Sequence, residues 1–322
     1  MEEQLPGVEK DVLLAPYTTF GIGGPAKYFF RAKTKQDIVD GVQVAKASKM
    51  PFFVLAGGSN VLVSDAGFEG LVIFIENTKH EINETTVISD AGVTVSTLVE
   101  ETGKRGLAGL EWAGGLPGTL GGAVRGNAGA FGGETKDIVV SVEAVNYEGE
   151  VRMFSNEECM FSYRSSIFKE EGWVVLSVTL DMKEGNASEL QKIAAEHILY
   201  REERHPLEYP NAGSVFKNCD FANFPEEFKD QVKEKVKTDP FPVVPTAYII
   251  SEADLKGLRV GGAQVSEKHP NYIVNTGKAT ANDVLELISQ VKERVKERFG
   301  VDLEQEIQYI SSSLYILKTP HF

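Results

Sequence analysis

Two glycine-rich segments of the chain are its clearest candidates for binding chemistry. In the first, residues 55–65 (LAGGSNVLVSD), Gly57 and Gly58 follow an expected strand and permit positive φ angles. Backbone N–H groups in such a turn converge on an anion, and Ser59 and Asn60 add side-chain hydrogen bonds. The pattern predicts a cradle for a pyrophosphate, although the same residues between two strands are also typical of a plain turn.

The second segment, residues 110–133 (LEWAGGLPGTLGGAVRGNAGAFGG), contains more glycine than a packed core needs. Glycine loses the most entropy on folding, so this density favours backbone that lies against a flat ring or a diphosphate. The step Pro117, Gly118, Thr119 is expected to start a short helix whose N-terminus faces phosphate. The segment is not the G-x-G-x-x-G of a dinucleotide fold, because no strand directly precedes it and no suitably spaced acidic residue follows. A Walker A loop is also absent.

Three short motifs outside the glycine segments contain residues suited to catalysis. They are FSYRSSIF at 161–168, NAGSVFKN at 211–218 and LEQEI at 303–307. Taken singly, Arg164 is typical of a surface arginine, Ser214 of a turn serine and Glu306 of a solvated glutamate. Alternation along a strand places Glu304 and Glu306 on the same face, so spacing alone does not distinguish the two carboxylates.

Composition and charge narrow the classes of function. The chain has 322 residues, 42% of them hydrophobic and 25% charged, which is an ordinary globular composition. Its net charge of −14 argues against nucleic acid or an anionic membrane as the main partner. A phosphorylated substrate therefore needs a local concentration of Lys and Arg. Residues 1–15 lack the apolar run of a signal peptide and no later run is long enough to span a membrane, which predicts a soluble, cytoplasmic protein.

The two cysteines, Cys159 and Cys219, do not form a disulfide framework and lack metal-ligand spacing. They favour a reducing compartment, and no metal site is expected.

The elements that position these residues are predicted from hydrophobic periodicity. A helix at 36–50 with strands at 52–56, 61–63 and 71–75 predicts an α/β lobe. A second lobe is expected to hold a helix at 96–105, strands at 138–146, 151–154 and 173–181, and an amphipathic helix at 188–203. The last third contains helices at 225–237 and 281–299, the latter with Thr280 as N-cap and Gly300 as stop. We predict an α+β protein with limits 1–90, 91–205 and 206–322.

Together with TTFGIGGPA at 18–26, the two glycine segments resemble the FAD-binding domain shared by flavoproteins of the vanillyl-alcohol-oxidase (PCMH) type. In detail they are similar to its MurB branch, the UDP-N-acetylenolpyruvoylglucosamine reductases, over about residues 15–310. The resemblance implies a two-lobed FAD-binding domain followed by a C-terminal α+β substrate-binding domain. The FAD contacts that it implies are Gly57, Gly58, Ser59, Asn60, Gly115, Pro117, Gly118, Thr119, Gly121, Gly122, Asn127 and Ala128.

The resemblance also implies a reaction. The family reduces the enolpyruvyl ether of UDP-N-acetylglucosamine enolpyruvate to UDP-N-acetylmuramate in peptidoglycan precursor synthesis, with NADPH as hydride donor. Relatives that bind flavin covalently use His or Cys in these loops. Neither glycine loop here contains one, so we expect non-covalent FAD.

By the same resemblance, Arg164 matches the family's active-site arginine, Ser214 its proton donor and Glu306 its catalytic glutamate. Hydride addition to the terminal alkene carbon drives negative charge onto the neighbouring carbon and its carboxylate, which a guanidinium and a nearby acid stabilise. The enolate is basic enough to take a proton from an alcohol. Lys217 and Asn218 follow directly and, with Arg164, are expected to bind substrate. His269 is either a surface histidine or a site residue.

The chain departs from the family pattern in places. Cys219 stands where proline is usual, Arg125 and Gly126 precede Asn127 where apolar residues are common, and the segment 220–246 is long. The short link between Asp181 and His205 leaves no room for the tyrosine-bearing insertion of the type I enzymes, which indicates the type II form.

Two other functions are alternatives to the reductase that the resemblance implies. Another non-covalent FAD oxidoreductase of the same superfamily, acting on a hydroxy acid or an alditol, predicts O2 consumption and leaves Ser214 and Glu306 unexplained. A flavin-retaining binding protein without catalysis leaves all three catalytic candidates unexplained.

Overall fold

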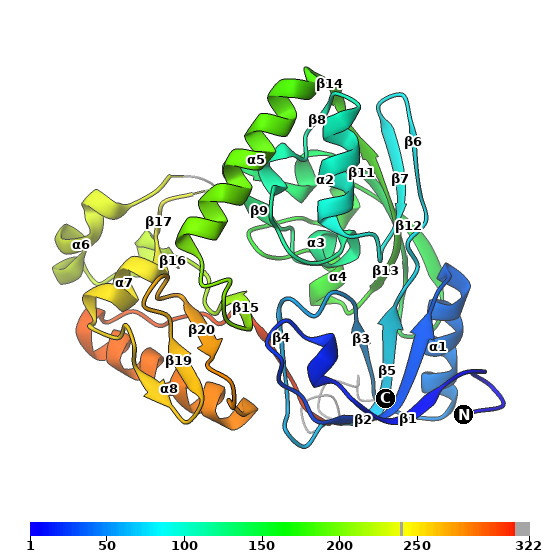
Figure 1. Ribbon diagram of the computed structural model, residues 1–322, viewed down its shortest axis with the longest axis horizontal. Helices are drawn as coiled ribbons and strands as arrows, with labels where there is room; N and C mark the ends of the chain where they lie inside the picture. The colour runs from blue at the N-terminus through cyan, green and yellow to red at the C-terminus, as the bar shows by residue number, and fades with distance from the viewer. Residues whose placement is uncertain (239–240, 313–322) are drawn as a thin grey trace.

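The computed structural model describes residues 1–238 and 241–312, and these form two lobes and a C-terminal part that meet at the centre of the molecule (Figure 1). The predicted C-terminal limit, 206–322, includes residues 239–240 and 313–322, which lie outside the described residues.

The first lobe contains a four-stranded sheet in the order β1-β2-β5-β3. Three of its strands are parallel and β1 is antiparallel: β1 (Glu9–Leu13), β2 (Pro25–Ala32), β3 (Phe52–Leu55) and β5 (Phe68–Ile75). Helix α1 (Lys35–Ala47) makes the crossover from β2 to β3 that parallel strands require. A capping box of Thr34 and Asp37 begins α1, and its buried face packs into the core of this lobe.

The second lobe contains a five-stranded antiparallel sheet in the order β12-β11-β13-β7-β6. Its strands are β6 (His80–Asn83), β7 (Thr86–Asp90), β11 (Val139–Val145), β12 (Val151–Ser155) and β13 (Val174–Asp181). Both β6 and β7 lie in the range that the sequence assigned to the first lobe. They join the second sheet because β7 pairs with β13, where Val87 opposite Leu180 enters the second core.

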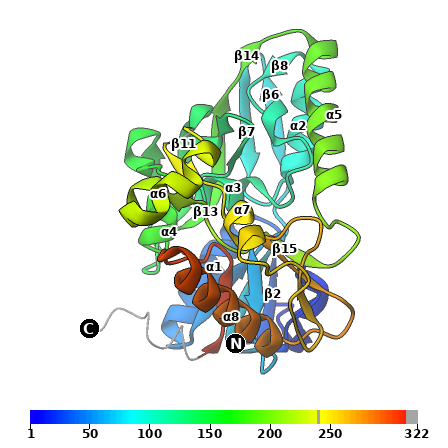
Figure 2. The same cartoon turned by 90° about the vertical axis from the view of Figure 1, so that its left-hand side faces the viewer.

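Four helices belong to the second lobe: α2 (Val95–Lys104), α3 (Leu120–Arg125), α4 (Ile167–Glu170) and α5 (Ala187–Arg204). Thr119 is the N-cap of α3, so the helix predicted after Pro117 is confirmed. In Figure 2, α5 runs along one side of this lobe and leads down toward the C-terminal part.

The C-terminal part is a sheet packed on helices. The sheet order is β15-β20-β19-β18, with β15 (Asn211–Ser214), β18 (Arg259–Val260), β19 (Ala263–Val265) and β20 (Tyr272–Asn275). The helices are α6 (Glu226–Val232), α7 (Thr246–Glu252) and α8 (Ala281–Phe299). As predicted, Thr280 caps α8 and Gly300, with φ +67°, ends it.

The chain returns from this part to the first lobe. Strand β21 (Gln308–Ile310) pairs parallel with β4 (Val61–Val63), which directly follows the first glycine loop. The carboxylate of Asp65 accepts hydrogen bonds from the backbone N–H groups of Ala281 and Asn282, at 2.8 and 3.2 Å. An acid at a helix N-terminus is favourable, so Asp65 ties α8 to the first lobe.

The remaining elements are short. They are β8 (Leu107–Ala108), β9 (Gly129–Ala130), β10 (Gly133–Glu134), β14 (Lys183–Glu184), β16 (Cys219–Asp220), β17 (Val243–Val244) and the 3-10 helices Ala15–Tyr17, Glu111–Ala113, Thr135–Asp137, Glu157–Cys159, Phe221–Asn223 and Lys233–Lys235. Among the helices of residues 1–238 and 241–312, none has the length and apolar character needed to cross a membrane.

We predict that Asp65→Ala lowers the free energy of unfolding by about 1 kcal/mol, because two N–H groups of the first turn of α8 lose their acceptor. Urea unfolding measures the change. Asp302→Ala is the matched control, since that carboxylate is 83% exposed and pairs with Lys296 at the surface. Equal stability of Asp65→Ala and wild type would contradict this role.

Candidate active site

The two glycine loops predicted to bind a cofactor lie against each other. A Cβ on Gly57 would lie 2.9 Å from the Cα of Gly118, and a Cβ on Gly118 would lie 2.8 Å from Oγ of Ser59. Gly58 has φ +60°, and its Cβ would overlap the carbonyl oxygen of Tyr17 at 2.2 Å. Glycine is therefore required here by close backbone approach as well as by conformation.

The hydrogen bonds of the first loop leave its N–H groups available. The carbonyl of Gly58 accepts from Thr19, and that of Asn60 accepts from the N–H of Gln308 at 3.0 Å. Within the described residues, the backbone N–H groups of Gly58, Ser59 and Asn60 donate to no protein acceptor. A turn whose carbonyls are bonded and whose N–H groups are not fits a bound anion such as the FAD diphosphate.

The second glycine segment combines structural and binding positions. Gly121 donates its N–H to the carbonyl of Ala91, and a Cβ there would meet the Ala91 side chain at 2.8 Å. The buried Asn127 side chain donates to the carbonyl of Ser162 at 3.0 Å and accepts from the N–H of Lys136. These two predicted contact residues therefore also hold the second lobe together. Gly115, Pro117 and Gly122 are exposed.

Arg201 lies beside the second glycine segment and was not predicted from the sequence. Its Nε donates to the carbonyl of Gly114 at 2.9 Å, and its Cδ would touch a Cβ on Gly115. Arg201 is only 9% exposed, and its Nη2 has no hydrogen-bond partner in the part of the chain that the structure describes. Burial lowers its pKa. A buried, partly unbonded guanidinium next to this loop fits an anionic cofactor group. In the sequence it is one of many charged residues of α5.

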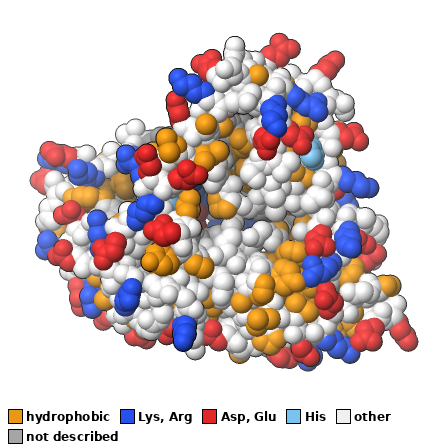
Figure 3. All heavy atoms as spheres, viewed as in Figure 1, with side chains coloured by type: hydrophobic (Ala, Val, Ile, Leu, Met, Phe, Trp, Pro, Cys, Tyr) orange, Lys and Arg blue, Asp and Glu red, His pale blue; other side chains and the backbone are white. Residues whose placement is uncertain are grey.

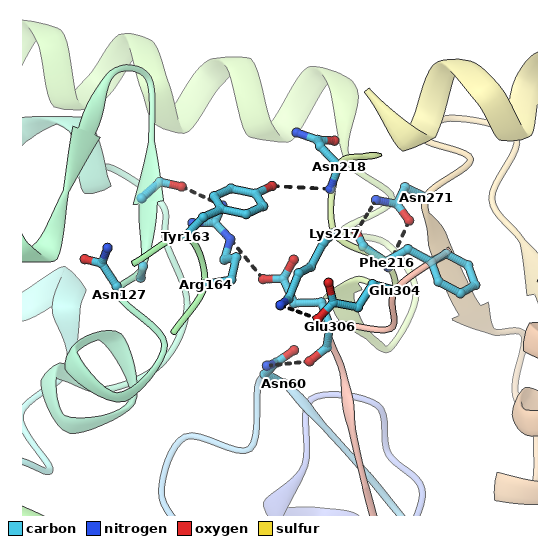
Figure 4. Close-up of polar contacts among 12 residues, drawn as sticks. Asn60, Asn127, Tyr163, Arg164, Phe216, Lys217, Asn218, Asn271, Glu304 and Glu306 are labelled. Carbon is cyan, nitrogen blue, oxygen red and sulfur yellow. Dashed lines mark hydrogen bonds and ion pairs between the residues drawn. The ribbon is translucent and has the colours of Figure 1, made fainter. Parts of the chain in front are cut away.

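The residues predicted to be catalytic come together between the second lobe and the C-terminal part. Arg164 has φ +56°, and its Nε lies 3.1 Å from Oε1 of Glu306 (Figure 4). Its Nη2 donates to the carbonyl of Gly129 at 2.9 Å, which links the guanidinium to the end of the glycine segment. Side-chain exposure is 24% for Arg164 and 22% for Glu306.

The structure distinguishes Glu304 from Glu306, which their spacing in the sequence could not do. The side chain of Glu304 is 70% exposed and pairs with Lys217, whereas Glu306 is enclosed beside Arg164. Backbone bonds position both: the N–H of Glu306 donates to the carbonyl of Val215 at 2.8 Å, and the carbonyl of Glu304 accepts from Lys217. The Nδ2 of Asn60 donates to the carbonyl of Glu306 at 3.3 Å (Figure 4), so the first glycine loop contacts the same segment.

Cations gather around Glu306. Burial raises the pKa of the Glu306 carboxyl, although Arg164, Lys169 and Lys217 each act to lower it. Lys169 was not predicted: its Nζ donates to the carbonyl of Arg164 at 2.8 Å, and burial, Lys217 and Arg125 lower its pKa. Its place five residues after Arg164 was the signal that the sequence offered. The local concentration of positive charge is what a phosphorylated substrate requires of an acidic chain.

Ser214 ends β15 and is half-buried. Because Val215 accepts the N–H of Glu306, the segment that carries Ser214 runs beside the segment that carries the glutamate. Asn271, 4% exposed, braces this segment with two hydrogen bonds to the backbone of Phe216, at 2.8 and 3.1 Å (Figure 4). The sequence analysis missed this role of Asn271, because the two residues are far apart in the chain.

The predicted substrate residues flank this site. Lys217 has a side chain that is 15% exposed and pairs with Glu304. The N–H of Asn218 donates to the phenol oxygen of Tyr163 at 3.3 Å, and its Oδ1 accepts from the N–H of Thr246 at the start of α7. Figure 3 shows the surface hollowed where the C-terminal part meets the two lobes. In the described residues, no group of His, Cys, Asp and Glu side chains is arranged to hold a metal ion.

The sequence of the chain matches two known protein families. Residues 26–155 match the FAD binding domain family, and residues 205–310 match the C-terminal domain family of UDP-N-acetylenolpyruvoylglucosamine reductase. The chain is thus an FAD-dependent oxidoreductase, with FAD as its cofactor and NADPH as its reductant.

Relatives and a solved structure define the family. UDP-N-acetylenolpyruvoylglucosamine reductases of Alkaliphilus oremlandii and Caldanaerobacter subterraneus subsp. tengcongensis are 40% and 38% identical, and each match covers 91% of this chain and 90% of the relative. The crystal structure of the enzyme (MurB) from Thermus caldophilus has a TM-score of 0.74 and 34% identity, covering 94% of this chain and 98% of that one. The chain belongs to the UDP-N-acetylenolpyruvoylglucosamine reductase (MurB) family. The principal expectation from the sequence is confirmed, in preference to another FAD oxidoreductase of the same superfamily.

We predict that Gly58→Ala weakens FAD binding by about tenfold or more, because the added Cβ overlaps the Tyr17 carbonyl and shifts the loop. FAD titration monitored by flavin fluorescence measures the affinity. Gly172→Ala is the matched control: φ is +75° there, but no atom lies within 4 Å of the new Cβ. The control should lose about 1 kcal/mol of stability and keep its FAD affinity. Equal FAD affinities for both variants would show that the close approach is unimportant.

The raised pKa of Glu306 predicts a pH-dependent stability. A carboxyl whose pKa is higher in the folded state binds its proton more tightly there, so its contribution to stability is lost as pH rises through the folded pKa. The variant Glu306→Gln has no carboxyl at this position, so it does not show this loss of stability. Its free energy of unfolding relative to wild type should therefore increase as pH rises above about 4.3, the ordinary value for a glutamate, and through the raised pKa, as measured by urea unfolding at a series of pH values. The exposed Glu304→Gln is the control and should follow the wild-type profile; a flat difference for Glu306→Gln would refute the prediction.

Proposed function

We propose that this chain reduces the enolpyruvyl ether of UDP-N-acetylglucosamine enolpyruvate to UDP-N-acetylmuramate in peptidoglycan precursor synthesis. The observation that carries the proposal is the meeting of Arg164, Glu306 and the Ser214 segment beside the first glycine loop. Family membership supports the same substrate. FAD held by the two glycine loops would supply the hydride chemistry, from NADPH to the terminal alkene carbon.

Arg164 binds the substrate carboxylate. Hydride addition places negative charge on the neighbouring carbon and on this carboxylate, and a positioned guanidinium stabilises that charge. The bonds of Arg164 to Glu306 and Gly129 hold it in place before substrate arrives. Such preorganisation avoids the cost of reorienting the group during the reaction.

Ser214 donates the proton that completes the reduction. The enolate is basic enough to deprotonate an aliphatic alcohol. Glu306, whose pKa is raised by burial, supplies a hydrogen bond to the enolate as its charge develops. It is the next acid in line if Ser214 does not act.

Lys217 and Asn218, with Arg164, bind the charged and polar groups of the sugar nucleotide. Lys217 faces Glu306 together with Lys169, and an ammonium is suited to phosphate as a point charge. The substrate carries two phosphates and a carboxylate, so a local cluster of cations offsets the net charge of −14.

We assign the non-covalent FAD contacts to the two glycine loops and add Arg201 to them. The loop contacts are Gly57, Gly58, Ser59, Asn60, Gly115, Pro117, Gly118, Thr119, Gly121, Gly122, Asn127 and Ala128. Residues 1–205 form the two lobes of the FAD-binding domain, with β6 and β7 in the second lobe, and residues 206–322 form the substrate-binding domain of a type II enzyme. NADPH as reductant and two buried free thiols support a cytoplasmic enzyme, without nucleic acid, membrane or an obligate protein as partner.

Ser214→Ala tests the proposed function by separating the two half-reactions. In wild type, the flavin absorbance should bleach with NADPH and return when UDP-N-acetylglucosamine enolpyruvate is added. The variant should bleach normally, because Ser214 is assigned no flavin contact. Its reoxidation by substrate should slow by about 10²–10⁴-fold, since a positioned general acid is missing. Reoxidation at the wild-type rate in stopped flow would place the acid elsewhere.

A further inference from the structure

Behind Ser214 lies a buried phenol that connects it to a histidine. Ser214 on β15 is the register partner of Tyr272 on β20, so the two side chains lie on the same face of this sheet, and the Ser214 hydroxyl acts on the Tyr272 phenol. On its other side, the phenol oxygen lies 3.1 Å from Nδ1 of His205. Tyr272 is 8% exposed, and His205, which directly follows α5, is half-buried.

The surroundings keep this chain of groups neutral. Burial raises the pKa of Tyr272 to about 12, with Arg201 lowering and Glu306 raising it. Burial, together with the neighbouring His269, Arg201 and Lys268, lowers the pKa of His205 to about 4. Near neutral pH the phenol is therefore protonated and the imidazole uncharged, the states in which each group both donates and accepts a hydrogen bond.

His269 completes the enclosure of the relay. Its ring centroid lies 4.8 Å from that of Tyr272 and 5.2 Å from that of His205, in edge-on geometry with both. His269 is half-buried, and its Nδ1 is enclosed without a hydrogen-bond partner among the described residues. Of the two alternatives that the sequence left open for this histidine, its packing against Tyr272 and His205 favours a place next to the site.

We propose that Tyr272 and His205 form a proton relay that orients the Ser214 hydroxyl and restores its proton as the enolate is protonated. The inference rests on the proposed role of Ser214 as the proton donor. Tyr272 and His205 are positioning and relay residues, because they act through Ser214 and do not touch the substrate carbon.

The proton transfers balance without any further reactant. The O–H bond of Ser214 breaks as the C–H bond forms at the ether-bearing carbon, and the Tyr272 hydroxyl proton moves to Oγ of Ser214. The Nδ1 proton of His205 moves to the phenol oxygen while Nε2 takes one proton from solvent. His205 starts as the Nδ1–H tautomer and ends as the Nε2–H tautomer, and exchange with water resets it. One solvent proton is consumed in each turnover, and no electrons move along the relay.

A purely structural hydrogen bond predicts different behaviour. A buried tyrosine commonly finds a partner for its hydroxyl, and loss of that bond alone would lower stability without changing how many protons move in the chemical step. The number of moving protons therefore distinguishes a relay from packing.

The test uses the FAD-loaded enzyme and Tyr272→Phe, which retains the ring. Reduction by NADPH should stay within about twofold of wild type, and single-turnover reoxidation by UDP-N-acetylglucosamine enolpyruvate should slow by about 10–100-fold, at the lower end of general-acid effects. Rates in H2O/D2O mixtures should give a curved proton inventory for wild type and a straight line for Tyr272→Phe. Tyr248→Phe on α7, whose ring lies over Lys235, is the matched control and should leave every rate and the curvature unchanged.

His205→Gln provides a second variant. Glutamine keeps a hydrogen bond to the phenol but cannot carry a proton, so the variant should reoxidise at a rate between those of wild type and Tyr272→Phe and should lose the curvature. Thermal unfolding checks that each variant is folded.

The outcomes separate failure of the relay from failure of the proposed function. If Ser214→Ala is inactive in reoxidation but Tyr272→Phe reoxidises at the wild-type rate, or keeps the curved inventory, the relay is overturned and Ser214 remains the donor. Equal slowing of both half-reactions in Tyr272→Phe would also overturn it, because that pattern indicates structural damage. If Ser214→Ala itself reoxidises normally, the proposed role of Ser214 fails, and the relay fails with it.

Discussion

The ion pair between Arg164 and Glu306 is the interaction on which the rest of the site depends. Arg164 belongs to the second lobe and Glu306 to the segment that returns from the C-terminal part to the first lobe, so one contact joins all three parts. Arg164 also holds the carbonyl of Gly129, and the backbone of Glu306 is held by Asn60 and Val215. Moving either residue would therefore disturb a glycine loop and the Ser214 segment together. The positive φ of Arg164 costs about 1–2 kcal/mol, which the surrounding bonds offset.

Charge is distributed unevenly in this molecule for a physical reason. A net charge of −14 repels anions from most of the surface, yet Arg164, Lys169 and Lys217 converge on one buried carboxylate. The carboxylate keeps the cations together in the absence of substrate, and burial makes it a weaker acid than usual. The same enclosure keeps Tyr272 and His205 neutral behind Ser214. Burial therefore serves two purposes here: it concentrates positive charge on the substrate side and excludes charge from the proton path.

The glycine loops show how far sequence reasoning reaches. Their glycine density predicted close backbone approach, and the structure shows that approach at Gly57, Gly58 and Gly118. The glycine density did not predict which of these positions serve packing. Gly121, for example, packs against Ala91, and this contact depends on the residue that follows a strand elsewhere in the chain. Nor did it predict Arg201, since a buried arginine on a charged helix has no local signature. The predicted limit at residue 90 put the segment of β6 and β7 in the first lobe for the same reason: the pairing partners of a strand are distant residues.

By itself, the sequence determined the elements whose periodicity and caps are local, such as α1, α5 and α8 with Thr280 and Gly300, and it identified the family through motifs. It also determined which residue types are present for the chemistry. Only the tertiary structure decided that Glu306 is enclosed while Glu304 is exposed, although both lie in one short segment. Only the tertiary structure decided that Tyr272 joins Ser214 to His205. The physical reason is that burial and hydrogen-bond partners are properties of the assembled surroundings, which residues far apart in the chain supply.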